Sequence, residues 1–320
     1  MTEAASISIR IGISACLLGQ EVRYDGGHKR DSYLVDTFGR YVEWVPVCPE
    51  VEMGLGTPRE TLRLVRINND VRMVMTKTGV DHTDGMRAFA ARRVSELARE
   101  NLSGYVLKKN SPSCGMERVK VFNAHGVPSK PGQGVFAEIL LKHFPHLPVE
   151  EEGRLGDPHL RENFIERVFA YARLRSLFSG RWKMADLVAF HTAHKLLLMA
   201  HSPQAYQRLG RMVAEAKSIG RAELRERYEP EFMGALREMA TTKQHVNVLE
   251  HIAGYFRKHL DADSRQELQA VNHDYHSGIV PLVVPLTLIN HYVRKFEVPY
   301  LRAQVYLEPH PKELMLRNHV

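Results

Sequence analysis

The sequence predicts two domains of different class: an α/β domain with a parallel sheet, followed by an all-α domain. Residues 1–150 alternate short β-branched runs with helical segments, which is typical of a parallel α/β sheet. Residues 155–320 form one helical segment after another. The chain has 320 residues, whereas single cores stop growing at roughly 250–300 residues. A join rich in proline, glycine and acidic residues separates the two parts.

The first domain is predicted from alternation and helical spacing. Runs rich in β-branched residues predict three strands and one hairpin, over residues 7–15, 42–47, 104–107 and 62–76. Apolar residues at helical spacing predict helices over residues 31–38, 84–101 and 134–141. Because strands and helices alternate, we expect the strands to pair in parallel.

The second domain is predicted to contain seven helices. Their ranges are 161–178, 183–200, 203–218, 221–239, 241–260, 263–276 and 285–296. In the segment 241–260 an apolar stripe runs through Val248, Leu249, Ile252 and Phe256, as expected for a helix with one buried face.

Composition excludes several classes of protein. Hydrophobic residues make up 44% and charged residues 25% of the chain, which rules out a disordered or collagen-like chain. The best apolar run, residues 279–289, is interrupted by Pro281 and Pro285 and is shorter than the roughly 18–20 residues of a membrane span. Glu3 lies early and no basic stretch precedes an apolar one, so a secretory signal is not expected. Three cysteines, an odd number, favour the reducing cytoplasm.

All three cysteines follow predicted strands. Cys16 comes after the strand 7–15, Cys48 ends the strand 42–47, and Cys114 comes shortly after the strand 104–107. In an open parallel sheet the carboxyl ends of the strands line the ligand crevice. The three thiols are therefore expected to converge at the carboxyl ends of the strands.

Three converging thiols suit several chemistries, and their spacing leaves four interpretations open. A [4Fe–4S] cluster held by three cysteines would have one iron without a protein ligand, able to act as a Lewis acid. Zinc could bind three cysteines and His28, although the paired C-x-x-C spacing of zinc sites is absent. A single thiol could act as a nucleophile or persulfide carrier. The cysteines could also pack simply as small apolar residues.

Polar neighbours of the cysteines add candidate functional residues. Glu50 lies two residues beyond Cys48, where a carboxylate beside a Lewis acid could activate water. The alternative is a solvated loop residue. Ser111 and Ser113 precede Cys114, and Asp25 lies in a glycine-rich turn.

Basic residues suggest an anionic partner. The net charge is +7, which favours such a partner. Lys108 and Lys109 end the strand that leads to Cys114, where they could meet a phosphate. In the helical domain the candidates for RNA contact are Arg161, Arg167, Arg173, Arg175, Arg181 and Lys183. The alternative is that these residues form a solvated helix face without a partner role.

Five short segments resemble the thiouracil desulfidase family, over roughly residues 7–146. They are residues 13–19, 23–27, 47–51, 54–60 and 111–115. The second half resembles the helical YbgA-like domain, through residues 245–256 and 300–311. The two-domain arrangement is similar to that of bacterial tRNA 4-thiouridine desulfidases.

The resemblance implies a specific site and reaction. Cys16, Cys48 and Cys114 match the ligands of a [4Fe–4S] cluster, and Glu50 matches the catalytic carboxylate. A serine of the Ser-Pro-Ser-Cys motif is also implied, with Ser111 favoured over Ser113. The open iron would bind the thiocarbonyl sulfur of 4-thiouridine in tRNA while Glu50 activates water. The products would be uridine and hydrosulfide, without net electron transfer.

Two alternatives remain from the sequence. The substrate could be free thiouracil or a thionucleoside, or the chain could be a metal-containing RNA-binding or regulatory protein without catalysis. If the substrate is instead thiolated tRNA, the helical domain would bind RNA. The residues expected to contact substrate are Asp25, Ser113, Lys108 and Lys109.

Overall fold

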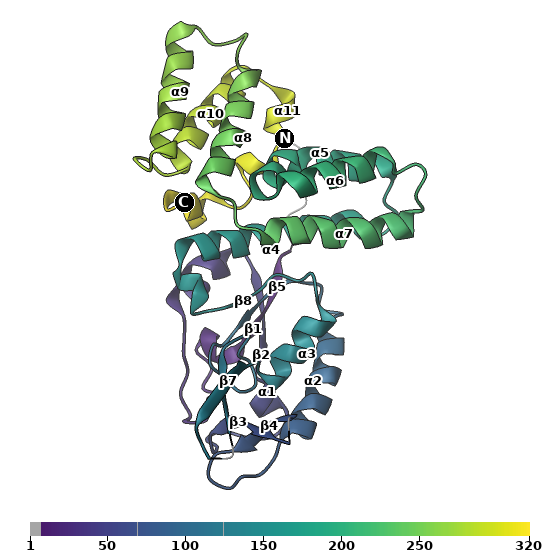
Figure 1. The fold of residues 1–320 in the computed structure, drawn as a ribbon, viewed down its shortest axis with the longest axis vertical. Coiled ribbons are helices and arrows are strands. Elements are labelled where there is room, and N and C mark those ends of the chain that lie inside the picture. The colour runs from purple at the N-terminus through teal and green to yellow at the C-terminus, as the bar shows by residue number, and fades with distance from the viewer. Residues whose placement is uncertain (1–7, 69, 124) are drawn as a thin grey trace. The chain divides into compact units, whose positions relative to one another are not determined.

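The computed structural model describes residues 8–68, 70–123 and 125–320 (Figure 1). The chain divides into two compact units, Met1–Asp157 and Pro158–Val320. Ile7, which begins the predicted strand 7–15, lies outside the described residues. So does Glu3, which was part of the reason for expecting no secretory signal. Within the described part of the chain, no helix has both the length and the apolar character needed to cross a membrane.

The first unit is built on a sheet of four parallel strands in the order β2-β1-β5-β8. Their bounds are Arg10–Ser14 for β1, Glu43–Val47 for β2, Leu102–Leu107 for β5 and Val149–Glu151 for β8. Ile11 and Ile13 of β1 are fully buried. Gly12 pairs with Tyr105, whose ring would lie 2.2 Å from a Cβ atom at position 12, so no larger residue fits there.

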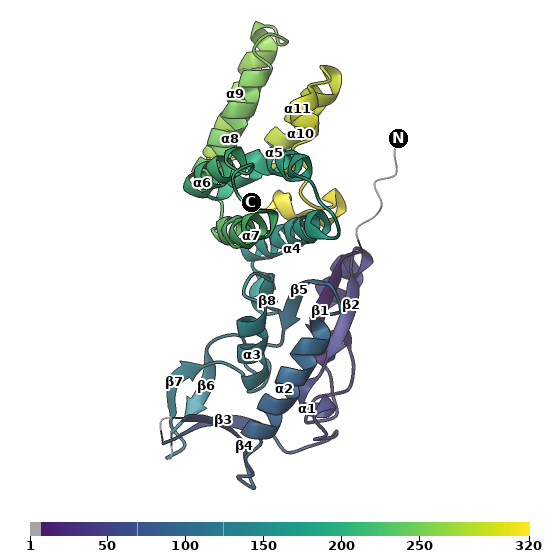
Figure 2. The same ribbon diagram turned by 90° about the vertical axis from the view of Figure 1, so that its right-hand side faces the viewer.

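Helices α2 (Thr83–Leu97) and α3 (Val135–His143) pack against each other. They lie on the same side of the sheet (Figures 1 and 2). Their buried apolar faces supply much of the core, through Met86, Phe89, Ala90, Val94, Leu97, Phe136 and Leu140. The predicted fold class, a parallel α/β unit followed by a helical unit, is confirmed.

A second sheet was not predicted. It has the order β4-β3-β6-β7, with bounds Leu62–Ile67 for β3, Asp70–Met75 for β4, Val119–Phe122 for β6 and Pro128–Gly132 for β7. The predicted hairpin forms β3 and β4, which pair in an antiparallel manner, but they belong to this sheet. Strand β6 is short and β7 contains Pro128 and Pro131, so neither shows a strand pattern in the sequence.

Two segments differ from their prediction. The segment 31–38 forms only short turns, Tyr33–Thr37 and Phe38–Arg40, in place of a regular helix. The join after residue 146 contains β8, in which Glu150 and Glu151 are buried. Glu150 pairs with Arg154 at 2.7 Å, and Glu151 Oε1 accepts the Met116 N–H at 2.7 Å. These partners compensate for the burial of the two carboxylates.

The second unit consists mainly of helices. The longer ones are α4 (Pro158–Phe178), α5 (Met184–His201), α6 (Pro203–Ala214), α7 (Arg221–Arg237), α8 (Thr242–Tyr255), α9 (Ala262–His276) and α10 (Val283–Lys295). Helix α11 (Pro299–Arg302) and three single turns follow. Thr241 caps α8, because its Oγ1 accepts the Gln244 N–H at 3.3 Å while Gln244 Oε1 accepts the Thr241 N–H at 2.8 Å.

A buried charged cluster ties the C-terminal segment to α4. Arg317 Nε lies 3.0 Å from Glu162, and Arg317 Nη2 lies 3.2 Å from Glu166. His201 Nε2 lies 2.5 Å from Glu166. Burial alone would raise the pKa of Glu166, but the nearby His201 and Arg317 lower it to about 2. Burial would lower the pKa of His201, but Glu166 raises it above its usual range.

Two of the arginines predicted as candidates for RNA contact are packed within the helical unit. Arg167 is buried, and Arg173 Nη2 donates to the backbone oxygen of Pro309 at 2.7 Å. They are therefore not available on a solvated face for RNA.

We predict that Arg317→Met destabilises the helical unit by about 3–5 kcal/mol, because it leaves the buried Glu162 without its cation and Glu166 with His201 alone. Unfolding monitored by circular dichroism against denaturant measures the change. The lowered pKa of Glu166 means that its contribution is present above its ordinary pKa of 4.5 and is lost as the pH falls towards 2. The difference between wild type and variant should therefore shrink in acid.

Arg302→Ala is the control, because its ion pair with Glu297 at 3.9 Å is solvent-exposed. It should unfold like wild type. Equal stability of Arg317→Met and Arg302→Ala would contradict the role assigned to the buried cluster.

Candidate active site

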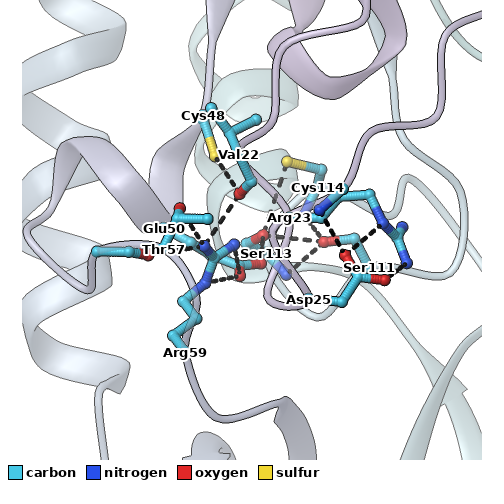
Figure 3. Close-up of polar contacts among 12 residues, drawn as sticks. Val22, Arg23, Asp25, Cys48, Glu50, Thr57, Arg59, Ser111, Ser113 and Cys114 are labelled. Carbon is cyan, nitrogen blue, oxygen red and sulfur yellow. Dashed lines mark hydrogen bonds and ion pairs between the residues drawn. The ribbon is translucent and has the colours of Figure 1, made fainter.

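A cavity of about 360 Å³ opens where β1, β2 and β5 end. Its wall comes from the segments that follow these three strands and from the residues leading into β3. Cys16, Cys48 and Cys114 all line it. Figure 3 shows Cys48 and Cys114 with the polar residues around them. The structure thus brings the three thiols of the chain around one cavity.

Each cysteine is fixed by the turn that follows its strand. Cys16 lies in the turn Ala15–Leu18, and its carbonyl accepts the Lys29 N–H at 2.9 Å. Cys48 precedes α1 (Pro49–Glu52) and its N–H donates to Glu52 Oε1 at 2.8 Å. Cys114 ends a tight turn in which its own N–H donates to Ser111 Oγ at 3.1 Å.

Burial raises the pKa of all three thiols. The pKa of Cys16 rises to about 11, although Lys108 acts in the opposite direction. Cys114 shifts further, with the negative charge of Glu50 adding to the effect of burial. Cys48 is half-buried, and its pKa is also raised by burial. A positively charged group among the sulfur atoms would oppose this effect, because it favours the thiolates.

The carboxylate of Glu50 lies in the same wall, on α1. Its side chain is 15% exposed. Oε1 accepts the hydroxyl hydrogen of Ser113 at 2.7 Å. Oε2 accepts from Arg59, through Nε at 2.9 Å and Nη2 at 2.6 Å (Figure 3). Both oxygens are therefore oriented by named donors.

The two serines form a directed chain of hydrogen bonds. Ser111 Oγ accepts the N–H groups of Ser113 at 3.3 Å and of Cys114 at 3.1 Å. The two hydroxyl oxygens lie 2.9 Å apart. Each hydroxyl has one hydrogen, and an ionised carboxylate only accepts. Because Ser113 donates to Glu50, the hydrogen between the serines belongs to Ser111, and the chain runs from Ser111 through Ser113 to Glu50.

The other residues expected to contact substrate lie in different surroundings. Lys108 Nζ pairs with Glu152, so its charge is compensated, whereas Lys109 is exposed on the cavity wall. Asp25 accepts the Gly27 N–H at 3.1 Å and pairs with Arg23 at 3.3 Å. The bond from Gly27 and the one from Arg23 lower its pKa. Asp25 thus stabilises its own turn, and the neighbouring Arg23 lines the cavity.

Sequence reasoning missed several residues of the wall. Arg23, Tyr24, Lys29 and Arg59 line the cavity. Arg59 lies in the segment 54–60, one of the five that resemble the thiouracil desulfidase family. That resemblance was the signal that could have identified it as a site residue. His28, considered as a fourth zinc ligand, instead accepts the Arg30 N–H at 3.2 Å through Nδ1.

The arrangement of donors suits a group larger than one ion. In the described residues, no three side chains of His, Cys, Asp or Glu are placed to hold a single metal ion. The three sulfur atoms instead line the wall of a cavity. Soft thiolate donors around such a space fit an iron–sulfur cluster.

Comparison with known protein families gives two matches. A family model described as 2-thiouracil desulfurase matches residues 11–152. A second, described as a protein of unknown function (DUF1722), matches residues 195–311.

Individual proteins are similar to parts of the chain. The uncharacterized protein YbgA of Escherichia coli (strain K12) is 33% identical over 158 residues, 49% of this chain and 94% of that protein. The uncharacterized protein YbbK of Bacillus subtilis (strain 168) is 34% identical over 111 residues, 32% of this chain and 71% of that protein. A solved structure titled [4Fe-4S]-dependent thiouracil desulfidase TudS is 32% identical and covers 47% of this chain and 94% of that one, with a TM-score of 0.39.

We predict that Gly134→Ala displaces the turn that holds Ser113 and Cys114. A Cβ atom at position 134 would lie 2.5 Å from the backbone oxygen of Ser113. Relief of this contact should cost about 1–3 kcal/mol of stability and expose the Cys114 thiol. Labelling of the reduced, metal-free chain with a thiol reagent, followed by peptide mass spectrometry, measures the exposure.

Gly156→Ala is the matched control, because a Cβ atom there meets nothing within 4 Å. Cys114 should react faster in Gly134→Ala than in wild type or Gly156→Ala. Identical labelling in all three proteins would refute the tight packing of this turn.

Proposed function

We propose that this chain, which belongs to the 2-thiouracil desulfurase family through residues 11–152, is a [4Fe–4S]-dependent desulfidase acting on 4-thiouridine in tRNA. It would work in the cytoplasm, where tRNA is found. The observation that supports it best is the grouping of three cysteines, Glu50 and two serines around one cavity. A thiol-lined cavity with an oriented carboxylate suits hydrolysis of a carbon–sulfur bond.

The donor set fits a cluster. Cys16, Cys48 and Cys114 would hold it, and the chain has no fourth cysteine. When bound, such a cluster supplies an iron without a cysteine ligand, a Lewis acid that prefers soft sulfur over oxygen. The similar solved structure is titled [4Fe-4S]-dependent, in agreement with this assignment.

The residues of the chain would perform the proton transfers. Oε1 of Glu50 faces the Ser113 hydroxyl and would accept a proton from a water that attacks ring carbon C4. Ser111 and Ser113 would keep the carboxylate and this water aligned. The water oxygen becomes the carbonyl oxygen, the carbon–sulfur bond breaks, and sulfur leaves as hydrosulfide with one of the two protons. No electron is gained or lost.

Charge at the cavity mouth favours a nucleic-acid substrate. Lys29 and Lys109 line the cavity and are exposed, whereas the charge of Arg23 on the same wall is compensated by Asp25. Such a rim attracts phosphate groups, which supply much of the affinity of proteins for RNA. A free pyrimidine base carries no phosphate and gains little from it. The helical unit would add RNA contacts from another part of the chain.

A second candidate is desulfidation of free thiouracil or a thionucleoside. The printed name of the similar solved structure, a thiouracil desulfidase, favours this substrate. The chemistry at Glu50 would be the same, and only the role of the basic rim would differ.

We predict that the anaerobically reconstituted chain binds about four iron and four labile sulfide per molecule. Cys16→Ala, Cys48→Ala and Cys114→Ala should each lose most of both, because every thiol contributes one ligand. Colorimetric iron and sulfide assays with absorption spectra test this. Zinc in the wild-type chain, or retention of the full cluster in any of the three variants, would reject the proposed cofactor site.

We further predict that Lys29→Ala combined with Lys109→Ala selectively weakens action on thiolated tRNA. Each lost phosphate contact should remove roughly a threefold dependence of kcat/KM on salt between 50 and 200 mM. Turnover of free 4-thiouracil should be unchanged. Sulfide release from both substrates at several salt concentrations makes the comparison.

Lys142→Ala, an exposed lysine on α3, serves as control. If wild type acts on the free base faster than on tRNA and without salt dependence, the second candidate replaces the first. Absence of sulfide release from every thiolated pyrimidine would reject both.

A further inference from the structure

Arg59 is the most extensively bonded side chain in the cavity wall. Its side chain is only 5% exposed. Nε and Nη2 both donate to Glu50 Oε2, at 2.9 and 2.6 Å. Nη1 donates to the backbone oxygen of Val22 at 2.9 Å (Figure 3). It also donates to the backbone oxygen of Gly56 at 2.9 Å. One planar guanidinium therefore connects the loop after β1, helix α1 and the segment leading into β3.

The backbone around Arg59 is also held in place. Gly54 and Gly56 have φ of 100° and 70°, values that favour glycine and allow the chain to turn back towards α1. The Arg59 N–H donates to the backbone oxygen of Tyr24 at 2.9 Å. The bend thus delivers the guanidinium to Glu50 in a fixed direction.

The two carboxylate oxygens of Glu50 have different hydrogen-bond partners. Oε2 is bound by the arginine fork, while Oε1 accepts from Ser113. We infer that Arg59 is a positioning residue that directs Oε1 towards the reacting water by binding Oε2. The inference rests on the proposed desulfidase function and adds to it the choice of the active oxygen.

A second partner of Arg59 lies next to Cys48. The backbone oxygen of Val22 lies 3.7 Å from Cys48 Sγ and accepts from Arg59 Nη1. Arg59 therefore also holds the loop after β1 in place beside Cys48.

Charge alone would not perform this task. A lysine presents one compact ammonium, whereas the planar fork of arginine binds several acceptors in fixed directions. Lysine at position 59 would preserve the positive charge beside Glu50 but not its simultaneous bonds to Oε2, Val22 and Gly56. Arg59→Lys therefore separates orientation from electrostatics.

The first test is kinetic and uses the reconstituted full chain with thiolated tRNA and with free 4-thiouracil. Arg59→Ala should lower kcat about 100-fold, since a misplaced catalytic group loses about this much rate, with KM within about threefold of wild type. Arg59→Lys should still lose roughly tenfold. Added guanidinium should restore part of the turnover of Arg59→Ala, because it can refill the vacated site.

The second test uses Glu50→Gln, which should itself lower kcat by about 10²–10⁴-fold. Because Arg59 acts through Glu50, adding Arg59→Ala to Glu50→Gln should change kcat by less than about threefold. Multiplicative losses would overturn the inference, because Arg59 would then act on the substrate directly. Full activity of Arg59→Lys would also overturn it, because charge would suffice.

The third test needs no turnover. In the metal-free chain, Arg59→Ala alone leaves a half-buried carboxylate without its cation, whereas the double variant removes both charges. The melting temperature should therefore fall further for Arg59→Ala than for Glu50→Gln combined with Arg59→Ala. Equal or additive losses would overturn the pairing.

Iron content and a matched control complete the design. Arg72→Ala breaks an ion-pair cluster with Asp70, Asp81 and Asp84 in the same unit, away from the cavity. It should keep wild-type kcat and iron. Loss of iron from both Arg59→Ala and Arg59→Lys would make Arg59 a residue that builds the cavity and would overturn its positioning role. Failure of the proposed function is distinct, because wild type itself would then release no sulfide.

Discussion

The site depends on one constraint: β1, β2 and β5 run parallel and end at the same edge of one sheet. The register sets Ser14 of β1 opposite Val47 of β2, so the residues that follow leave the sheet side by side. Cysteines distant in sequence thereby share one cavity wall. Gly12 allows β1 to lie close to β5, because the ring of Tyr105 occupies the space that a side chain at position 12 would fill. A register slip of one residue would turn every side chain of a strand to the other face and separate the thiols.

Both units use a buried arginine to fix acidic side chains. Arg59 joins Glu50 to two loops of the first unit, and Arg317 joins the C-terminal segment to Glu162 and Glu166 of α4. Such pairs contribute little net stability compared with apolar packing, because both ions lose their hydration. What they contribute is direction, since a guanidinium bonds only along its plane. In each unit the arginine comes from outside the regular helices and strands, so it also fixes the path of that segment.

Local spacing was enough to predict β1, β2, β5, α2 and α3, because their apolar residues repeat at the strand or helix period. The second sheet was missed, since β6 is short and β7 contains two prolines. Strand β8 was taken for a linker because two partners of its acidic residues, Arg154 and the Met116 N–H, lie outside the strand and are brought to it by folding. The same strand precedes Glu152, the partner of Lys108, so that pairing was hidden as well. The cysteines were foreseeable from topology, whereas the bend that delivers Arg59 to Glu50 follows from no spacing.

The proposed function assigns the cavity two chemical tasks. Its thiols, Glu50 and the serines would act on the thiocarbonyl, which every thiolated pyrimidine shares. Lys29 and Lys109, which are exposed on the same wall, would bind what is attached to that pyrimidine. Attraction of phosphate by such charges acts over about a Debye length, roughly 8–10 Å, and weakens with salt. Hydrogen bonds at Glu50 act only at contact. Under the proposed function, a change of these lysines would therefore shift preference between a free base and an RNA chain while the bond-breaking geometry stays unchanged.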